Sequence, residues 1–231
     1  MHYGRGQVEW ALWRSFTRAG LKGGDAPPVF LARIKRLLDI DRSPNLKNVE
    51  VLPEADYAFV ARPSSGSGEA EYTAADAFCL AIALDLLDAG FKQSEVVFLM
   101  RYLRPELERR FRTLLKRPSL IDRQHHRAED YPGVPSYEER GRRYADGRVF
   151  VLVQKLELTE IRPGLAGKKH VGPIFSAPVY CEGVEALGRK LHDTMPLHRR
   201  TVTILELAAT AQTVQMWLDK APIIRRGRPK G

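Results

Sequence analysis

Apolar residues in the first half of the chain recur every three or four positions, which is the spacing of amphipathic helices. The pattern predicts helices over residues 6–19, 28–40 and 73–89, one that starts at Ser94 and another that starts at Pro105. Glycines stand where these helices should end and prolines where two of them should begin, as glycine favours helix ends and proline the first turn.

The helical pattern stops between the second and third of these helices. Residues 49–51, 57–60 and 70–72 favour short strands, and the Ser- and Gly-rich stretch 63–68 favours a loop. Two helices followed by a strand, a loop and a returning strand is the order of elements in a winged helix-turn-helix. A plain helical hairpin with a solvated basic face is the alternative.

From Arg148 onward the pattern changes to that of strands. The predicted elements are strand 149–153, a proline-interrupted edge strand 171–181, helix 183–194, strand 200–206 and helix 210–219. The order β-β-α-β-α is typical of a small α+β domain, which we expect to carry its helices on one face. Such domains serve as ligand sensors or dimerisation units.

These patterns predict an α+β protein in four parts. Residues 1–117 would form a mostly helical, winged-helix-like DNA-binding domain, and the polar stretch 118–147 a linker or loop. Residues 148–220 would form the small β-β-α-β-α domain, and residues 221–231 a disordered basic tail.

Charge and cysteine content narrow the class of protein. The formal net charge of the 231 residues is +9, and much of the surplus lies in the last 81 residues, as expected of a polyanion binder. Cys79 and Cys181 stand far apart with no C-x-x-C pair, so there is no zinc or redox signature. No signal peptide and no apolar run of membrane-spanning length occurs, and we expect a cytoplasmic protein without membrane contact.

The last seven residues are the most specific motif of the chain. They read Arg225, Arg226, Gly227, Arg228, Pro229, Lys230 and Gly231. Gly227 allows close approach of the backbone, and Pro229 favours an extended path, so the tail is a thin basic ribbon. It resembles the AT-hook, a tail motif that binds the A·T-rich minor groove. The resemblance implies that Arg226 and Arg228 follow the groove floor, with Arg225 and Lys230 nearer the phosphates.

A second resemblance covers residues 57–103. The wing-like segment is followed by Tyr72-Thr73, a Leu-rich helix, Gly90-Phe91 and a helix that starts Gln93-Ser94-Glu95-Val96. This order is similar to the second half of MerR-type winged helix-turn-helix domains. The resemblance implies the fold only, and no base contacts are carried over from it.

Two further sets of basic residues are candidate DNA-contacting sites. Arg33, Lys35 and Arg36 should face outward on the helix 28–40, where a recognition helix would contact DNA. The seven basic residues between Arg101 and Arg117 form a stripe that either contacts phosphates or is only a solvated helix face.

The chain offers no recognisable catalytic motif. His125-His126 with Glu129 and Asp130 hold metal-binding side chains, but adjacent histidines converge poorly on one ion, so a solvated loop is favoured. No P-loop, dinucleotide fingerprint, H-E-x-x-H or G-x-S-x-G occurs. We therefore expect no cofactor, no metal and no catalytic residue, although an unlisted chemistry stays open.

The sequence favours a DNA-binding protein of the bacterial nucleoid, a transcriptional regulator with an accessory minor-groove-binding tail. Its expected partner is double-stranded DNA, and a homodimer is left open. The expected DNA-binding residues are Arg33, Lys35, Arg36, Arg225, Arg226, Gly227, Arg228, Pro229 and Lys230. The alternative is an interaction or assembly protein whose basic tail gives only nonspecific nucleic-acid affinity.

Overall fold

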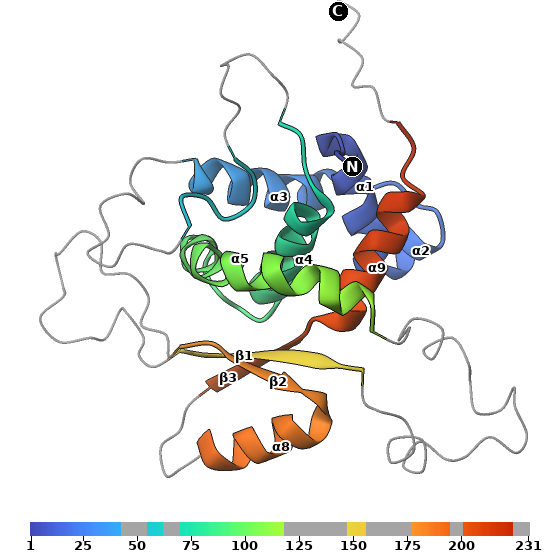
Figure 1. Ribbon diagram of the computed structural model, residues 1–231. Helices are drawn as coiled ribbons and strands as arrows, with labels where there is room; N and C mark the ends of the chain where they lie inside the picture. Colours follow the sequence, from blue (N-terminus) through green and yellow to red (C-terminus); the bar gives the residue numbers. More distant parts are fainter. Residues whose placement is uncertain (43–54, 62–69, 118–146, 156–176, 195–200, 224–231) are drawn as a thin grey trace, which may run out of the picture.

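A layer of helices lies on one face of a small antiparallel sheet, and one helix covers the other face (Figure 1). The structure is a computed structural model that describes residues 1–42, 55–61, 70–117, 147–155, 177–194 and 201–223. The helices are α1 (Arg5–Phe16), α2 (Arg18–Leu21), α3 (Pro28–Asp41), α4 (Ala74–Asp88), α5 (Gln93–Leu115), α8 (Gly183–Thr194) and α9 (Ala208–Asp219). The strands are β1 (Val149–Lys155), β2 (Val179–Glu182) and β3 (Thr201–Glu206). The mixed α+β class expected from the sequence is confirmed.

The start and end of α4 agree with its sequence signals. Thr73 Oγ1 accepts a hydrogen bond from the Asp76 N–H at 3.1 Å, and Asp76 Oδ2 accepts from the Thr73 N–H at 2.8 Å. This reciprocal capping box satisfies two backbone donors that the helix itself leaves free. Gly90, with a φ of 91°, follows the helix in the left-handed conformation that favours glycine.

The helix predicted to start at Pro105 does not exist as a separate element. Pro105 lies inside α5, which runs without a break from Gln93 to Leu115. One buried stripe passes through Met100, Leu103, Leu107 and Phe111 on both sides of the proline. Packing of this stripe outweighs the roughly 3 kcal/mol that an interior proline costs a helix.

The strand predicted at residues 57–60 is wrong, since this segment is irregular backbone. Of the strand predicted at residues 70–72, only Tyr72 forms a bridge, and its partner is Tyr3 near the start of the chain. The Tyr3 N–H donates to the Tyr72 carbonyl at 2.8 Å, and the Tyr72 N–H donates to the Tyr3 carbonyl at 2.9 Å. The remainder of the expected wing, residues 43–54 and 62–69, lies outside the described residues.

The second half has the predicted order β-β-α-β-α, with β1 between β2 and β3 and both pairings antiparallel. Alternate residues of β1 point to opposite faces of the sheet. Val149, Val151 and Val153 join the large core under the helices, while Phe150 and Leu152 pack against α8. The expectation of helices on one face only is therefore wrong, because α8 and the helical layer sandwich the sheet (Figure 1).

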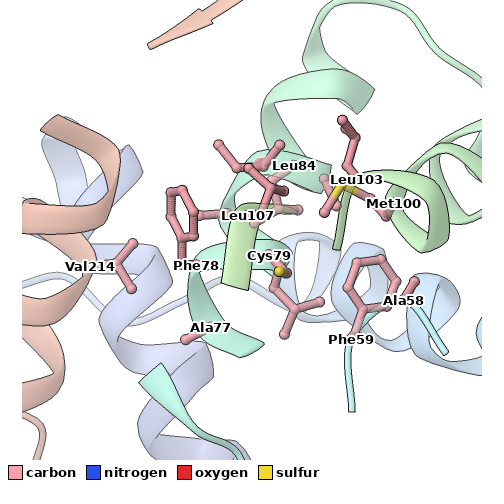
Figure 2. Close-up of a cluster of buried hydrophobic side chains, with 14 of the residues drawn as sticks. Ala58, Phe59, Ala77, Phe78, Cys79, Leu84, Met100, Leu103, Leu107 and Val214 are labelled. Atoms are coloured by element: carbon pink, nitrogen blue, oxygen red, sulfur yellow. The ribbon is translucent and has the colours of Figure 1, made fainter. Parts of the chain in front are cut away.

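A single large hydrophobic cluster joins elements from both halves of the chain. Phe78 of α4, Leu107 of α5 and Val214 of α9 all belong to this cluster, and so does Phe59 from the irregular segment (Figure 2). Val149 and Leu205 of the sheet belong to this cluster too. The segment expected as a linker lies outside the described residues apart from Gly147, so the division into two domains stays a prediction.

Candidate nucleic-acid interface

Helix α3 buries one face and presents a basic face to solvent. Ile34, Leu37 and Leu38 are buried, whereas Arg33, Lys35 and Arg36 are exposed, as their sequence spacing predicts. Val29 at the start of the helix is 69% exposed and shares a face with Arg33 and Arg36, four and seven residues later. The outer face therefore offers two guanidinium groups and an aliphatic group at helical spacing.

The connection from α1 to α3 is held by specific contacts. Trp13 packs edge-on against Phe30 with ring centroids 5.2 Å apart, and its Nε1 donates to the Gly24 carbonyl at 2.7 Å. A Cβ at Gly20 would lie 2.2 Å from the Trp13 carbonyl oxygen, so only glycine permits this close approach. These contacts fix the orientation of α3 relative to α1.

Arg33 also joins α3 to the end of α4. Its Nη1 donates to Asp88 Oδ1 at 2.7 Å, and the two side chains are 46% and 65% exposed. An ion pair this exposed holds its partners weakly, so another anion can compete with Asp88 for the guanidinium group. Lys35 and Arg36 form no hydrogen bond or ion pair within the described part of the chain.

Helix α9, which precedes the basic tail, is packed against α1. Trp217 contacts Trp10 edge-on with centroids 5.8 Å apart, and the Arg14 guanidinium lies over both rings, at 4.9 Å from Trp10 and 5.8 Å from Trp217. Figure 1 shows α9 running away from the sheet alongside α1. Described structure ends at Ile223, which is 83% exposed, so the predicted contacts Arg225, Arg226, Gly227, Arg228, Pro229 and Lys230 lie outside it.

The basic stripe expected between Arg101 and Arg117 is mostly occupied with internal contacts. Arg101 and Arg104 are buried. Arg109 and Arg110 both pair with Glu106, while Arg117 pairs with Glu182 of β2 at 2.8 Å. Within the described part of the chain, only the side chains of Arg112 and Lys116 in this stripe are exposed and have no ion pair or hydrogen bond, so the stripe is a poor phosphate surface.

Two buried ion pairs were missed by sequence reasoning. Arg101 Nε donates to Asp41 Oδ1 at 2.9 Å, and Arg104 pairs with Asp76, all four side chains being nearly inaccessible. The Ala58 N–H donates to both carboxylate oxygens of Asp41, at 2.9 Å and 3.0 Å, and the Phe59 N–H donates to Asp41 Oδ2 at 3.3 Å. Arg104 Nη1 donates to the carbonyls of the same two residues, 58 and 59. The two pairs thus fix the irregular segment 55–61.

A signal for the first of these pairs is present in the sequence. Asp41 follows Ile34 by seven residues and Leu37 by four, which places a carboxylate on the buried stripe of its helix. A charge on such a stripe requires an opposite charge or several hydrogen-bond donors.

The described residues include one fully buried thiol in the helical core and no metal-binding cluster. Burial raises the pKa of the Cys79 thiol to about 12, so it carries no thiolate near neutral pH. No group of three or more His, Cys, Asp or Glu side chains is placed to hold a metal ion in the described ranges. His125, His126, Glu129 and Asp130 lie outside them. Within the same ranges no helix is long and apolar enough to cross a membrane.

No family model and no curated protein matches the chain. The resemblances of the tail to the AT-hook and of residues 57–103 to MerR-type domains therefore stay predictions.

Proposed function

We propose that the protein binds double-stranded DNA as a transcriptional regulator, through the outer face of α3 and the basic tail. The observation that carries this proposal is the contrast between two sets of arginines. Arg33 and Arg36 of α3 are exposed, and only Arg33 has a carboxylate partner, the exposed Asp88. Most arginines of α5 are paired with carboxylates, and two of these pairs are buried. An exposed basic helix face fits the major groove, where Arg pairs with guanine and an aliphatic group such as Val29 contacts a thymine methyl.

The tail would add a second contact in the adjacent minor groove. Arg226 and Arg228 follow Ile223 by three and five residues, so an extended chain carries them at most about 18 Å from it. The minor-groove contact must therefore lie close to the end of α9. Joining two weak contacts raises the overall affinity because the second binding event becomes intramolecular.

The first experiment separates base contacts from phosphate contacts on α3. A bound sequence is selected from random duplexes, and binding is then measured by fluorescence anisotropy for Arg33→Ala, Arg36→Ala and Lys35→Ala. Each lost base contact should weaken binding to the selected duplex by about 1–3 kcal/mol more than binding to random duplex. A lost phosphate contact should weaken both equally and lower the salt slope by about one.

A matched control for this experiment is Arg189→Ala. Arg189 is an exposed arginine on α8, across the sheet from the helical layer, and it pairs with Glu185 at 3.0 Å. Its removal subtracts the same charge and should leave binding nearly unchanged. Equal losses for Arg33→Ala, Arg36→Ala and Arg189→Ala would mean that net charge alone drives binding and that α3 is not the interface.

The second experiment tests the order of residues in the tail. Deletion of residues 225–231 and a scrambled tail of the same composition should both weaken binding to A·T-rich duplex. On G·C-rich duplex the scramble should match the wild type, because the guanine amino group obstructs the minor groove. A scramble that matches the wild type on both DNAs, with the same salt slope, would reduce the tail to a nonspecific basic segment.

An assembly role is the second candidate, favoured by the sheet. Ile204 on the edge strand β3 is 40% exposed and Val184 of α8 is 43% exposed, so apolar side chains reach the surface there. In that role the sheet binds a protein and the tail only adds nucleic-acid affinity. Ile204→Lys should then abolish binding of the protein partner while DNA binding persists.

A further inference from the structure

A solvent-open cavity of about 500 Å³ lies where α3 meets the end of α4 and the start of α5. This volume is within the range of small-molecule sites. Part of its wall is apolar, formed by Ile40, Leu87 and Phe91. All three side chains are only half-buried, so they keep apolar area that a bound ligand would cover.

The rest of the lining is cationic or donates hydrogen bonds. Arg33 and Lys92 carry positive charge, and Gln93 and Ser94 form the first two positions of the 23-residue helix α5. Their backbone N–H groups have no acceptor among the described residues, while the Lys92 N–H donates to Glu95 Oε2 at 3.1 Å. The lining thus combines a guanidinium group, free amides and an apolar wall.

We propose that this cavity binds a small organic carboxylate with an apolar body. The carboxylate would pair with the Arg33 guanidinium, whose planar fork matches it, and with the amides of α5. The apolar body would cover Ile40, Leu87 and Phe91. A bare phosphate leaves that wall exposed, and an apolar amine meets positive charge, so only the combined ligand satisfies the whole lining.

Asp88, the last residue of α4, already supplies a carboxylate to Arg33. The substitution Asp88→Asn removes this negative charge, so it should free Arg33 and weaken the repulsion of an incoming carboxylate. The ligand should therefore bind severalfold more tightly to Asp88→Asn and about tenfold more weakly to Arg33→Ala. Opposite effects of these two exposed substitutions are expected only if the ligand carboxylate takes the place of Asp88.

Binding is tested by amide NMR on the full chain with octanoate as the probe. The signals of Gln93 and Ser94 should shift with a dissociation constant on the order of a millimolar or below, typical of about ten non-hydrogen atoms. Octylamine and inorganic phosphate should not shift them at the same concentrations, and Arg189→Ala should bind octanoate as the wild type does. Equal binding of octylamine, or unchanged binding in both Arg33→Ala and Asp88→Asn, would overturn the proposal.

A proline substitution isolates the contribution of the helix amides. Lys92 before α5 is already extended, with φ −70° and ψ 148°, which is the conformation that a following proline requires. Gln93→Pro therefore removes one N–H at the helix start without breaking α5, and Gln93→Ala removes only the side chain. Octanoate should bind more weakly to the proline variant than to the alanine variant, and equal affinities would exclude the amides from the site.

One consequence rests on the proposed DNA-binding function. Arg33 belongs to both surfaces, so a bound carboxylate competes with DNA for the same guanidinium group. Octanoate at a concentration that saturates the wild type should lower the affinity of the wild type for the selected duplex. The same concentration should lower the affinity of Gln93→Pro much less, because this variant binds octanoate more weakly and retains Arg33. If octanoate binds and DNA affinity is unchanged, the coupling is refuted. If the protein binds no duplex at all, the proposed function fails while the NMR test of the cavity stands.

Discussion

The buried pair of Asp41 and Arg101 gives the sharpest test of what stabilises the fold. Asp41→Ala removes the acceptor of the Arg101 guanidinium and of two backbone N–H groups in the irregular segment 55–61. It leaves a charged side chain that is only 5% exposed with the Asp41 backbone carbonyl as its remaining acceptor. Breaking a buried pair in this way costs about 3–5 kcal/mol, a large share of the roughly 5–15 kcal/mol that stabilises a typical domain.

The chain supplies a matched control in the exposed pair of Arg33 and Asp88. Both pairs join α3 to a neighbouring helix through an arginine and an aspartate, and they differ chiefly in burial. Asp88→Ala should cost less than about 1 kcal/mol, because solvent screens an exposed pair. The two losses should therefore differ several-fold.

Urea unfolding followed by tryptophan fluorescence and circular dichroism measures both losses. With a slope of about 2–3 kcal/mol per molar, Asp41→Ala should lower the midpoint by about 1.5 M and Asp88→Ala by less than about 0.5 M. The double variant Asp41→Leu/Arg101→Met should recover much of the loss, since no charge is then left unpaired. If Asp41→Ala costs no more than Asp88→Ala, the buried pair does not hold the irregular segment as described.

Three further predictions address other parts of the chain. Gly20→Ala should destabilise the protein by about 1–3 kcal/mol in the same assay, because the new methyl group meets the backbone of α1, whereas Gly188→Ala on exposed α8 should stabilise it by up to about 1 kcal/mol. Burial, aided by the nearby charge of Asp88, raises the pKa of Asp85 to about 7, so the unfolding free energy should decrease as the pH rises from about 4 to about 7. Asp85→Asn should remove this pH dependence and raise the unfolding free energy by about 1–3 kcal/mol at pH 8. Cleavage at a protease site engineered into residues 118–146 should leave two fragments that elute together on size exclusion, because they share one hydrophobic cluster.

Local signals in the sequence predicted most of the elements and few of their partners. The capping residues of α4 and the continuous run of β-favouring apolar residues in β1 act within a few residues, so they can be recognised without knowing the rest of the fold. Pairing of Tyr72 with Tyr3 joins positions 69 residues apart, and nothing in either local pattern specifies it. The prediction of a new helix at Pro105 was wrong for a related reason, because the packing that keeps α5 continuous comes from other helices.

The candidate interface was predicted in part. Outward positions for Arg33, Lys35 and Arg36 follow directly from helical spacing, and the structure shows them exposed. Arg101 and Arg104 of α5 are also basic residues on a helix, yet their carboxylate partners come from α3 and α4, so charge counts alone could not show that these two arginines are buried in ion pairs. The cavity beside Arg33 also draws on three helices, and no single stretch of sequence signals it.

The packing of α9 against α1 sets the order in which the chain can fold during synthesis. On the ribosome, α1 emerges about 200 residues before the helix that covers it, so its apolar face waits for nearly the whole chain to be made. Trp10, which packs against Trp217 of α9, then remains open to chaperones or to other nascent chains. Contacts this distant in sequence slow folding, because a long loop must close before they form. A chain truncated before residue 208 should therefore be retained by chaperones, however complete its earlier helices are.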